Sequence, residues 1–245
     1  MPQRHVFFIL TASLLASVLS LGVAAQARAA DSPQGWSGSA ELGGAVTTGN
    51  SRTSNLDAKL KLGFVSGPWD TQAHIETLRA TSSGQATANR TAAEAGTHYA
   101  LDATNYAFAH LRDTRDSFSG FRYQASVSAG LGHLLLNTPD VRLLAEIGPG
   151  YRRSALVGDG TQKNAIVRAH GAFTYHFSAH AKFKQTLTAI AGRDGTELES
   201  VTGLSTAITG STSLKIAYTV LHNTQVPLGR KKTDTFTTIN LVYAF

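Results

Sequence analysis

The chain has 245 residues, enough for one domain of moderate size, and it contains no cysteine. Disulfides, cysteine metal sites and cysteine nucleophiles are therefore excluded. The formal net charge of +6 is mild and the basic residues are not clustered, so the composition does not indicate a nucleic-acid partner. With 42% hydrophobic residues and a mean hydropathy near zero, the chain is too polar for a helical membrane protein, but it suits a β-barrel or a soluble β-protein.

The first 29 residues have the pattern of a secretory signal peptide. Arg4 and His5 give a basic start, an apolar run covers 6–23, and Ala27-Arg28-Ala29 offers a cleavage site with small residues. A transmembrane anchor is the alternative, because the run approaches the length that crosses a bilayer. Small residues follow the run and no second apolar helix appears, so we expect a cleaved segment at 1–29.

The remaining domain, residues 30–245, contains twelve segments in which polar and apolar residues alternate. Alternation with period two places successive side chains on opposite faces of a strand. Each segment has about ten residues or more, which a tilted strand needs to cross the hydrocarbon, whereas soluble strands are mostly about five or six residues long. The segments lie near 36–47, 53–66, 69–80, 91–102, 104–113, 120–134, 140–153, 164–177, 180–192, 196–208, 212–223 and 233–245.

These segments predict an all-β fold, a transmembrane antiparallel up-and-down β-barrel of about twelve strands. Ten strands is the alternative, because segment boundaries are uncertain by a few residues. The connections alternate in length, as in bacterial barrels. Short turns are expected at 66–69, 102–105, 136–140, 178–180 and 209–212, and longer polar loops at 81–90, 113–119, 154–163 and 223–232. Two connections on the long-loop side, Thr48-Gly49-Asn50-Ser51 and Arg193-Asp194-Gly195, are expected to be tight.

The last strand has an increasingly apolar face that carries Ile239, Leu241, Tyr243 and Phe245. Exposed in water, such a strand would be an aggregation hazard, but in a membrane it faces lipid and has an aromatic foot at the interface. It resembles the C-terminal assembly signal of bacterial outer-membrane β-barrels. We therefore expect a protein of the Gram-negative outer membrane whose partners are the membrane lipid and, during biogenesis, the barrel assembly machinery.

Charged side chains within the segments are expected to point into the lumen, since a charge facing lipid near the midplane costs roughly 2–4 kcal/mol. The candidate lumen residues are Lys59, Lys61, Glu76, Arg122, Arg142, Glu146, Arg168, His170, Lys182, Lys184 and Lys215. One interpretation is a narrow, somewhat cationic pore for small polar or anionic solutes. The other is a closed interior in which opposite charges pair and fill the lumen.

No pattern in the sequence indicates an enzyme, a cofactor or a metal site. A serine hydrolase is the sharpest enzymatic alternative, but the chain has no G-x-S-x-G motif. A protease-like barrel would need acidic pairs at the outer rim; Asp113, Asp116, Glu197 and Glu199 lie near outer loops, where we expect them to be solvated. We predict no catalytic, cofactor-binding or metal-binding residues. A soluble secreted β-sandwich also stays open, and it would fractionate without detergent.

Three glycine-containing stretches carry a family resemblance. They are Leu42 to Ser51 with the T-G-N-S turn, Asp113 to His133 with the S-A-G-L-G strand, and Gly148-Pro149-Gly150-Tyr151-Arg152. Together they resemble domain-of-unknown-function family 481, whose members are also called salt-induced outer membrane proteins. The resemblance covers the whole mature chain. It implies an outer-membrane barrel with a link to salt or envelope stress, and it supplies no substrate, cofactor or site residue.

Overall fold

The computed structural model of the chain describes residues 34–47, 53–116, 121–156, 160–226 and 231–245. The expected signal segment 1–29 and the expected tight turn Thr48-Gly49-Asn50-Ser51 lie outside these residues. The described part of the chain contains no helix that is long and apolar enough to cross a membrane.

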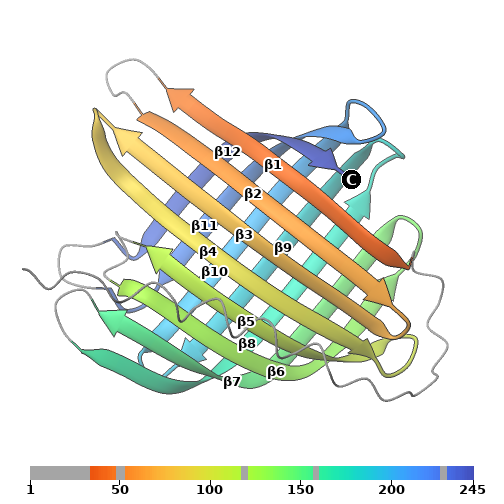
Figure 1. Cartoon of the computed structure of the whole chain (residues 1–245), viewed down its shortest axis with the longest axis horizontal. Helices are drawn as coiled ribbons and strands as arrows, with labels where there is room; N and C mark the ends of the chain where they lie inside the picture. The colour runs from red at the N-terminus through yellow and green to blue at the C-terminus, as the bar shows by residue number, and fades with distance from the viewer. Residues whose placement is uncertain (1–33, 48–52, 117–120, 157–159, 227–230) are drawn as a thin grey trace, which may run out of the picture.

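Twelve antiparallel strands form one closed barrel (Figure 1), which confirms the predicted fold class and favours twelve strands over ten. Each strand pairs with its neighbours in sequence, and β1 pairs with β12 to close the sheet. The strands are β1 (Gly35–Thr47), β2 (Thr53–Ser66), β3 (Trp69–Ser82), β4 (Gln85–Ala100), β5 (Asn105–Asp116), β6 (Phe121–Asn137), β7 (Val141–Leu156), β8 (Thr161–His176), β9 (Ala181–Gly192), β10 (Gly195–Ala207), β11 (Thr212–Asn223) and β12 (Thr233–Ala244).

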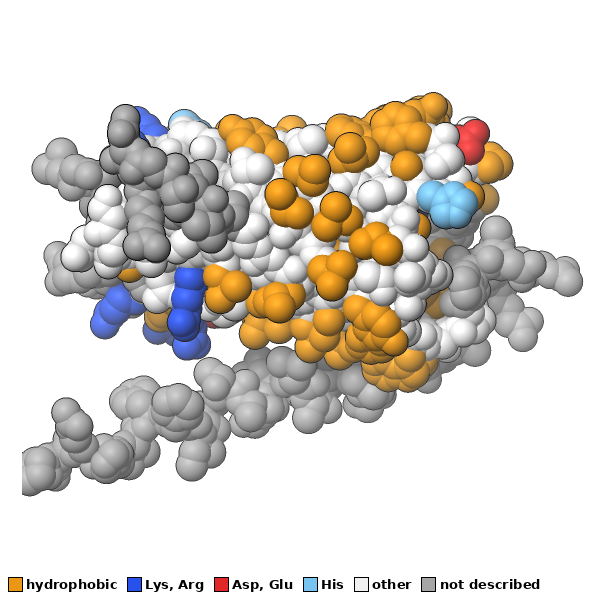
Figure 2. All heavy atoms as spheres, turned by 90° about the horizontal axis from the view of Figure 1, so that it is seen from above, with side chains coloured by type: hydrophobic (Ala, Val, Ile, Leu, Met, Phe, Trp, Pro, Cys, Tyr) orange, Lys and Arg blue, Asp and Glu red, His pale blue; other side chains and the backbone are white. Residues whose placement is uncertain are grey.

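The outer surface of the barrel is apolar around its middle. Leu60 in β2, Val127 in β6 and Ile147 in β7 are exposed large hydrophobic residues, at 43%, 47% and 62% of their surface. Figure 2 shows hydrophobic side chains spread over the middle of the visible face, in a zone that we call the apolar belt. A soluble protein rarely exposes so extended an apolar surface, so the belt indicates a lipid-facing wall.

The first residues of β1 and the last residues of β12 lie at one end of the barrel, which we call the proximal end. The turns that join β2 to β3, β4 to β5, β6 to β7, β8 to β9 and β10 to β11 lie at the same end. Phe245 closes the barrel there, because its backbone N–H donates to Gly38 O at 2.9 Å and Gly38 N–H donates to Phe245 O at 2.7 Å. Aromatic pairs lie at the same end: Trp36 contacts Phe64, and Trp69 contacts Tyr99, each with ring centroids 4.8 Å apart. Such rings are typical of the membrane–water interface.

The opposite, distal end differs from the sequence prediction in two connections. The expected loop at 81–90 is a two-residue turn, because Ser82 pairs with Gln85, and Ser83 and Gly84 adopt positive φ angles of 51° and 80°. The expected loop at 154–163 is also shorter, since β7 extends to Leu156 and β8 begins at Thr161. Here the strands continue past the apolar belt, so hydrogen bonding persists although the hydrophobic alternation that marks a strand in the sequence has ended.

Candidate functional site

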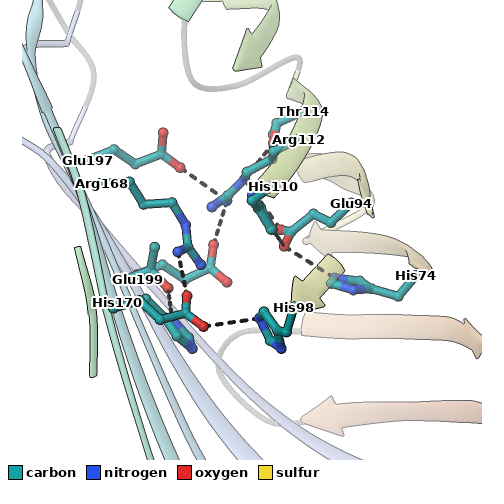
Figure 3. A network of polar contacts seen from close by, with 12 residues as sticks. His74, Glu94, His98, His110, Arg112, Thr114, Arg168, His170, Glu197 and Glu199 are labelled. Atoms are coloured by element: carbon teal, nitrogen blue, oxygen red, sulfur yellow. Dashed lines mark hydrogen bonds and ion pairs between the residues drawn. The ribbon is translucent and has the colours of Figure 1, made fainter. Parts of the chain in front are cut away.

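The lumen is crossed near its distal end by a group of ion pairs that we call the distal bridge: Arg90, Arg112, Glu197 and Glu199. Arg112 Nη2 lies 2.6 Å from Glu199 Oε2 and 3.1 Å from Glu197 Oε1, and Arg90 Nη2 lies 3.1 Å from Glu199 Oε2. Arg90 belongs to β4 and Glu199 to β10, which stand opposite each other in the closed strand order. The side chains therefore join opposite walls (Figure 3) and narrow the lumen.

Two histidines extend the distal bridge along the β3–β5 wall. Glu94 Oε1 lies 3.4 Å from Arg112 Nε, and Glu94 Oε2 lies 3.3 Å from His110 Nε2 and 3.7 Å from His74 Nε2. The carboxylate of Glu94 is thus surrounded by three nitrogen-bearing side chains from two strands. It compensates part of the Arg112 charge from the wall on which Arg112 itself stands.

A second group lies closer to the proximal end and centres on Glu146 in β7. Glu146 accepts hydrogen bonds from Arg168 Nη1 at 2.7 Å and from Tyr106 Oη at 3.1 Å, and its Oε1 lies 3.2 Å from His98 Nε2. Tyr106 reaches across Gly132, where a Cβ atom would lie 2.2 Å from the Tyr106 ring. The absence of a side chain at Gly132 is therefore what lets Tyr106 lie flat along the wall and reach Glu146.

The lysines on β2 and β11 are compensated locally, whereas the buried Asp57 on β2 accepts a hydrogen bond from Asn240. Glu41 accepts hydrogen bonds from Lys61 Nζ at 3.0 Å and from Lys215 Nζ at 2.7 Å, so one carboxylate serves two lysines. Lys59 forms an ion pair with Glu76 on β3. These contacts keep the β1–β3 wall close to neutral.

Three inward basic residues near the proximal end make no ion pair among the described residues: Arg142, Lys182 and Lys184. They lie on the same strand faces as lumen residues of β7 and β9, and all three are exposed. Lys184 lies within electrostatic reach of Lys61 and Lys215, which add positive charge to the same region. The inward face of β3 carries Asp70 at this end, so three basic residues outnumber it and leave the proximal mouth of the lumen cationic. In the distal half, the arginines are paired with carboxylates.

Between the distal bridge and the β10–β12 wall lies a small pocket. It is lined by charged groups such as Lys59, Glu76 and Glu199, and by apolar side chains such as Leu221 and Phe236. Leu221 points into the lumen and is buried there by neighbouring side chains, so no open water-filled space surrounds it. Inward apolar side chains thus fill part of the distal lumen and narrow it further.

The structure brings most of the predicted lumen residues into these groups. Glu146 and Arg168 meet directly, Lys59 meets Glu76, and Lys61 and Lys215 meet at Glu41. Predicted residue His170 lies on the wall next to Glu146 and its Nδ1 lies 2.9 Å from Thr188 Oγ1. Lys182, Lys184 and Arg142 form the cationic mouth described above.

Arg122 does not follow the predicted alternation. Phe121 pairs with Leu156 and Tyr123 with Ala155, so Arg122 is the extra residue of a β-bulge in β6. A bulge interrupts the regular alternation of faces. Arg122 is exposed, while its neighbour Phe121 is buried.

The distal bridge was missed by reasoning from the sequence. Glu197 and Glu199 were expected to be solvated near an outer loop, but both face Arg112 across the lumen. The signal was present: Glu197, Glu199 and Val201 alternate with Leu198 and Ser200 directly after Gly195, where β10 begins. Arg90 lay in a region expected to be a loop, which concealed it.

The described residues contain no group of three or more His, Asp or Glu side chains arranged to hold a metal ion. Within the same part of the chain, His170 contacts the hydroxyl of Thr188, and His222 Nδ1 lies 2.8 Å from that of Thr233. The chemistry that the lumen displays most clearly is electrostatic: fixed positive charge at one mouth and paired charge across the other half.

Comparison with known proteins agrees with this architecture. The translocator domain of the autotransporter NalP from Neisseria meningitidis is similar in structure, with a TM-score of 0.51 and 13% identity, over 87% of this chain and 89% of that one. The NanC porin covers 84% of this chain and 97% of its own, at a TM-score of 0.49 and 16% identity. At 13% identity the likeness to the NalP domain concerns the fold alone.

Sequence comparison gives the family. An uncharacterized protein of Escherichia coli K12, YdiY, is 26% identical over 208 residues, which cover 84% of this chain and 82% of that protein. The family model described as "Protein of unknown function, DUF481" matches residues 40–245, which include almost the whole barrel. The predicted resemblance is thereby confirmed, and the chain belongs to the DUF481 family.

Proposed function

We propose that the protein is a narrow outer-membrane pore that prefers small anionic solutes. The observation that carries the proposal is the uneven balance of charge along the lumen. Lys182, Lys184 and Arg142 have no carboxylate partner among the described residues, whereas the distal arginines Arg90, Arg112 and Arg152 all form ion pairs. Fixed positive charge in a low-dielectric channel raises the local concentration of anions and repels cations.

The distal bridge sets the size limit in this proposal. A solute that enters from the cationic mouth reaches side chains that join β4 and β5 to β10. Passage beyond them is restricted to small hydrated species that fit beside the bridge. The expected conductance is accordingly low compared with that of wide porins, whose 16 to 18 or so strands leave an open aqueous channel.

Recordings in planar bilayers under a KCl gradient test the proposal. The protein should give small current steps with a reversal potential on the anion-selective side, and Lys182→Glu/Lys184→Glu should move that potential toward cation selectivity. The matched control is Lys231→Glu/Lys232→Glu, which makes the same charge change at the distal end, outside the strands. Absence of steps, or an unchanged reversal potential in the Lys182/Lys184 variant, would refute the anion pore.

Export and assembly complete the proposal. Segment 1–29 would direct secretion and be cleaved, and the apolar face of β12 would be bound by the barrel assembly machinery. The outward face of β12 supports this role, since Ile239, Leu241, Tyr243 and Phe245 are all more than half exposed. The protein then stands in the outer membrane with its proximal end toward the periplasm.

Shortening the chain by Phe245 should lower the outer-membrane level several-fold, because the deletion removes both the terminal aromatic ring and the closing hydrogen bonds to Gly38. Phe245→Ala keeps those backbone bonds and separates the two effects. Phe177→Ala, at another exposed aromatic residue of the proximal end, is the control. The measurement is immunoblotting of outer-membrane fractions, and normal levels in both Phe245 variants would argue against an assembly signal.

The family resemblance adds a link to salt stress. In this proposal the pore adapts the envelope to osmotic change, so transcript and protein levels should rise when NaCl is added to the growth medium. Levels that do not respond to NaCl would remove this link and leave the pore proposal intact.

A further inference from the structure

The two rims of the barrel differ in the charge that they present to their surroundings. Outside the lumen, the described basic residues all lie at the distal end: Arg79, Arg115, Arg122, Arg153, Lys163, Arg193, Lys231 and Lys232. Outside the lumen, the proximal rim carries Asp102 and Asp140, and the distal end also carries Asp113, in an ion pair with Arg115. Figure 2 shows Lys and Arg side chains at one end of the apolar belt and an acidic side chain at the other.

Three of the distal basic residues, Arg153, Lys163 and Arg193, form a compact group that we call the basic triad. Arg153 on β7 pairs directly with Lys163 on β8, on the outward face. The β8–β9 register ends at Ile166 with Gly192, so Arg193 follows at the level of Ala165, two residues from Lys163. The triad thus gathers three positive charges from three successive segments of the wall.

The triad lacks an internal counter-ion. All three side chains are exposed, and none of them forms an ion pair among the described residues. Asp194, the acid next in sequence to Arg193, is buried inside the barrel in an ion pair with Arg152. Like charges directly opposite each other on neighbouring strands are destabilising. An external anion that bridges Arg153 and Lys163 would remove this repulsion.

The height of the triad matches the boundary of the membrane. Arg153 follows Val141, the first residue of β7 at the proximal end, by twelve positions. With a rise of about 3.3 Å per residue and a tilt of about 40°, it stands about 30 Å above Val141. The apolar band of such barrels is about 25 Å tall, so the triad lies where lipid head groups begin.

Apolar side chains lie directly beneath the triad. Tyr151, Val167 and Ile147 are exposed on the same outward face, at 46%, 49% and 62% of their surface. A ligand of this surface therefore meets cations at the interface and hydrocarbon below it. A soluble anion would use the cations alone, whereas a lipid with a phosphorylated head group would use both parts.

We propose that the basic triad, together with the column of Tyr151, Val167 and Ile147, is a binding site for a phosphorylated lipid of the outer leaflet. Arg153 and Arg193 offer planar guanidinium groups that bind phosphate through paired hydrogen bonds, and Lys163 adds a point charge. Acyl chains lie along the apolar column. The inference depends on the proposed orientation in the outer membrane and does not depend on whether the lumen conducts.

The test uses the full-length mature protein in detergent, with bis-phosphorylated lipid A as the probe. Arg153→Gln/Lys163→Gln/Arg193→Gln should weaken lipid A binding at least about tenfold, because each basic residue at a membrane surface contributes appreciably to the attraction of anionic lipid. Arg79→Gln/Lys231→Gln/Lys232→Gln removes the same charge from other parts of the distal end and should stay within about twofold of the original protein. Unchanged heat-dependent gel mobility verifies that both variants fold.

Four outcomes would overturn the site. Equal weakening in both triple variants would show diffuse electrostatic attraction instead of a defined site. Equally tight binding of dephosphorylated lipid A would show that the cations are not used. Competition by free pyrophosphate at the same concentration as lipid A would show that the apolar column contributes nothing. Equal affinity for phosphatidylglycerol would show no preference for the doubly phosphorylated lipid.

Discussion

The distal half of the lumen and its proximal mouth both carry basic residues, but these residues are paired with carboxylates in the distal half and unpaired at the mouth. In the distal half, Glu199 holds Arg90 and Arg112 from the opposite wall, so buried charge is compensated across the barrel. At the mouth, Lys182 and Lys184 stand on one strand without a carboxylate partner among the described residues, exposed to water. A buried charged side chain is costly unless an opposite charge or hydrogen bonds compensate it, whereas a charged side chain in contact with water needs no such partner. The paired region therefore serves the structure, and the unpaired region is available to solutes.

The largest effect is expected where compensation is removed from the buried region. Glu199→Gln leaves Arg90 and Arg112 without their shared carboxylate and should lower the free energy of unfolding by about 3 kcal/mol, the lower end of the range for broken buried ion pairs, because Glu199 keeps some solvent contact. Urea titration in phospholipid vesicles measures the change. Glu76→Gln is the control: among the described residues Glu76 forms an ion pair with one residue, Lys59, so its loss should cost less. Equal losses in both variants would contradict the bridge.

A second test separates the wall's two faces, on which the distinction between paired and hydrated charge depends. Leu60→Arg places a charge in lipid near the middle of β2 and should cost roughly 2–4 kcal/mol. Lys59→Leu, one residue away, removes an inward charge that pairs with Glu76 and should cost less. The same urea titration compares them, and equal tolerance would mean that the assignment of faces is wrong.

The smallest effect is expected at the mouth. Lys184→Gln should change the free energy of unfolding by no more than about 0.5 kcal/mol, as for other solvated positions, and relief of repulsion from Lys61 and Lys215 makes stabilisation the expected sign. A decrease of more than about 1 kcal/mol in the free energy of unfolding would show that Lys184 makes a stabilising contact, and it would contradict the difference expected between Lys184 and Glu199.

The sequence by itself predicted the barrel, about twelve strands with ten as the alternative, and the two faces of most strands. The reason is physical: lipid on one side and water on the other impose a period of two on every spanning segment. Lys59, Glu146 and Arg168 could therefore be assigned to the lumen before any coordinates. The terminal strand and its lipid-facing side, which carries Tyr243 and Phe245, could be predicted in the same way, because the residues on that side are apolar.

Only the tertiary structure decided which charges meet. Arg90 and Glu199 are 109 residues apart in the chain, and they lie opposite each other because the closed ring sets β4 against β10. Alternation fixes a side chain's face but carries no information about the partner across the lumen. Beyond the apolar belt, polar and apolar residues no longer alternate, so the two-residue turn between β3 and β4 could not be predicted. In β6, a bulge moves Arg122 off the face that alternation predicts. The partition of the lumen into a half with paired arginines and a cationic mouth follows from that closure.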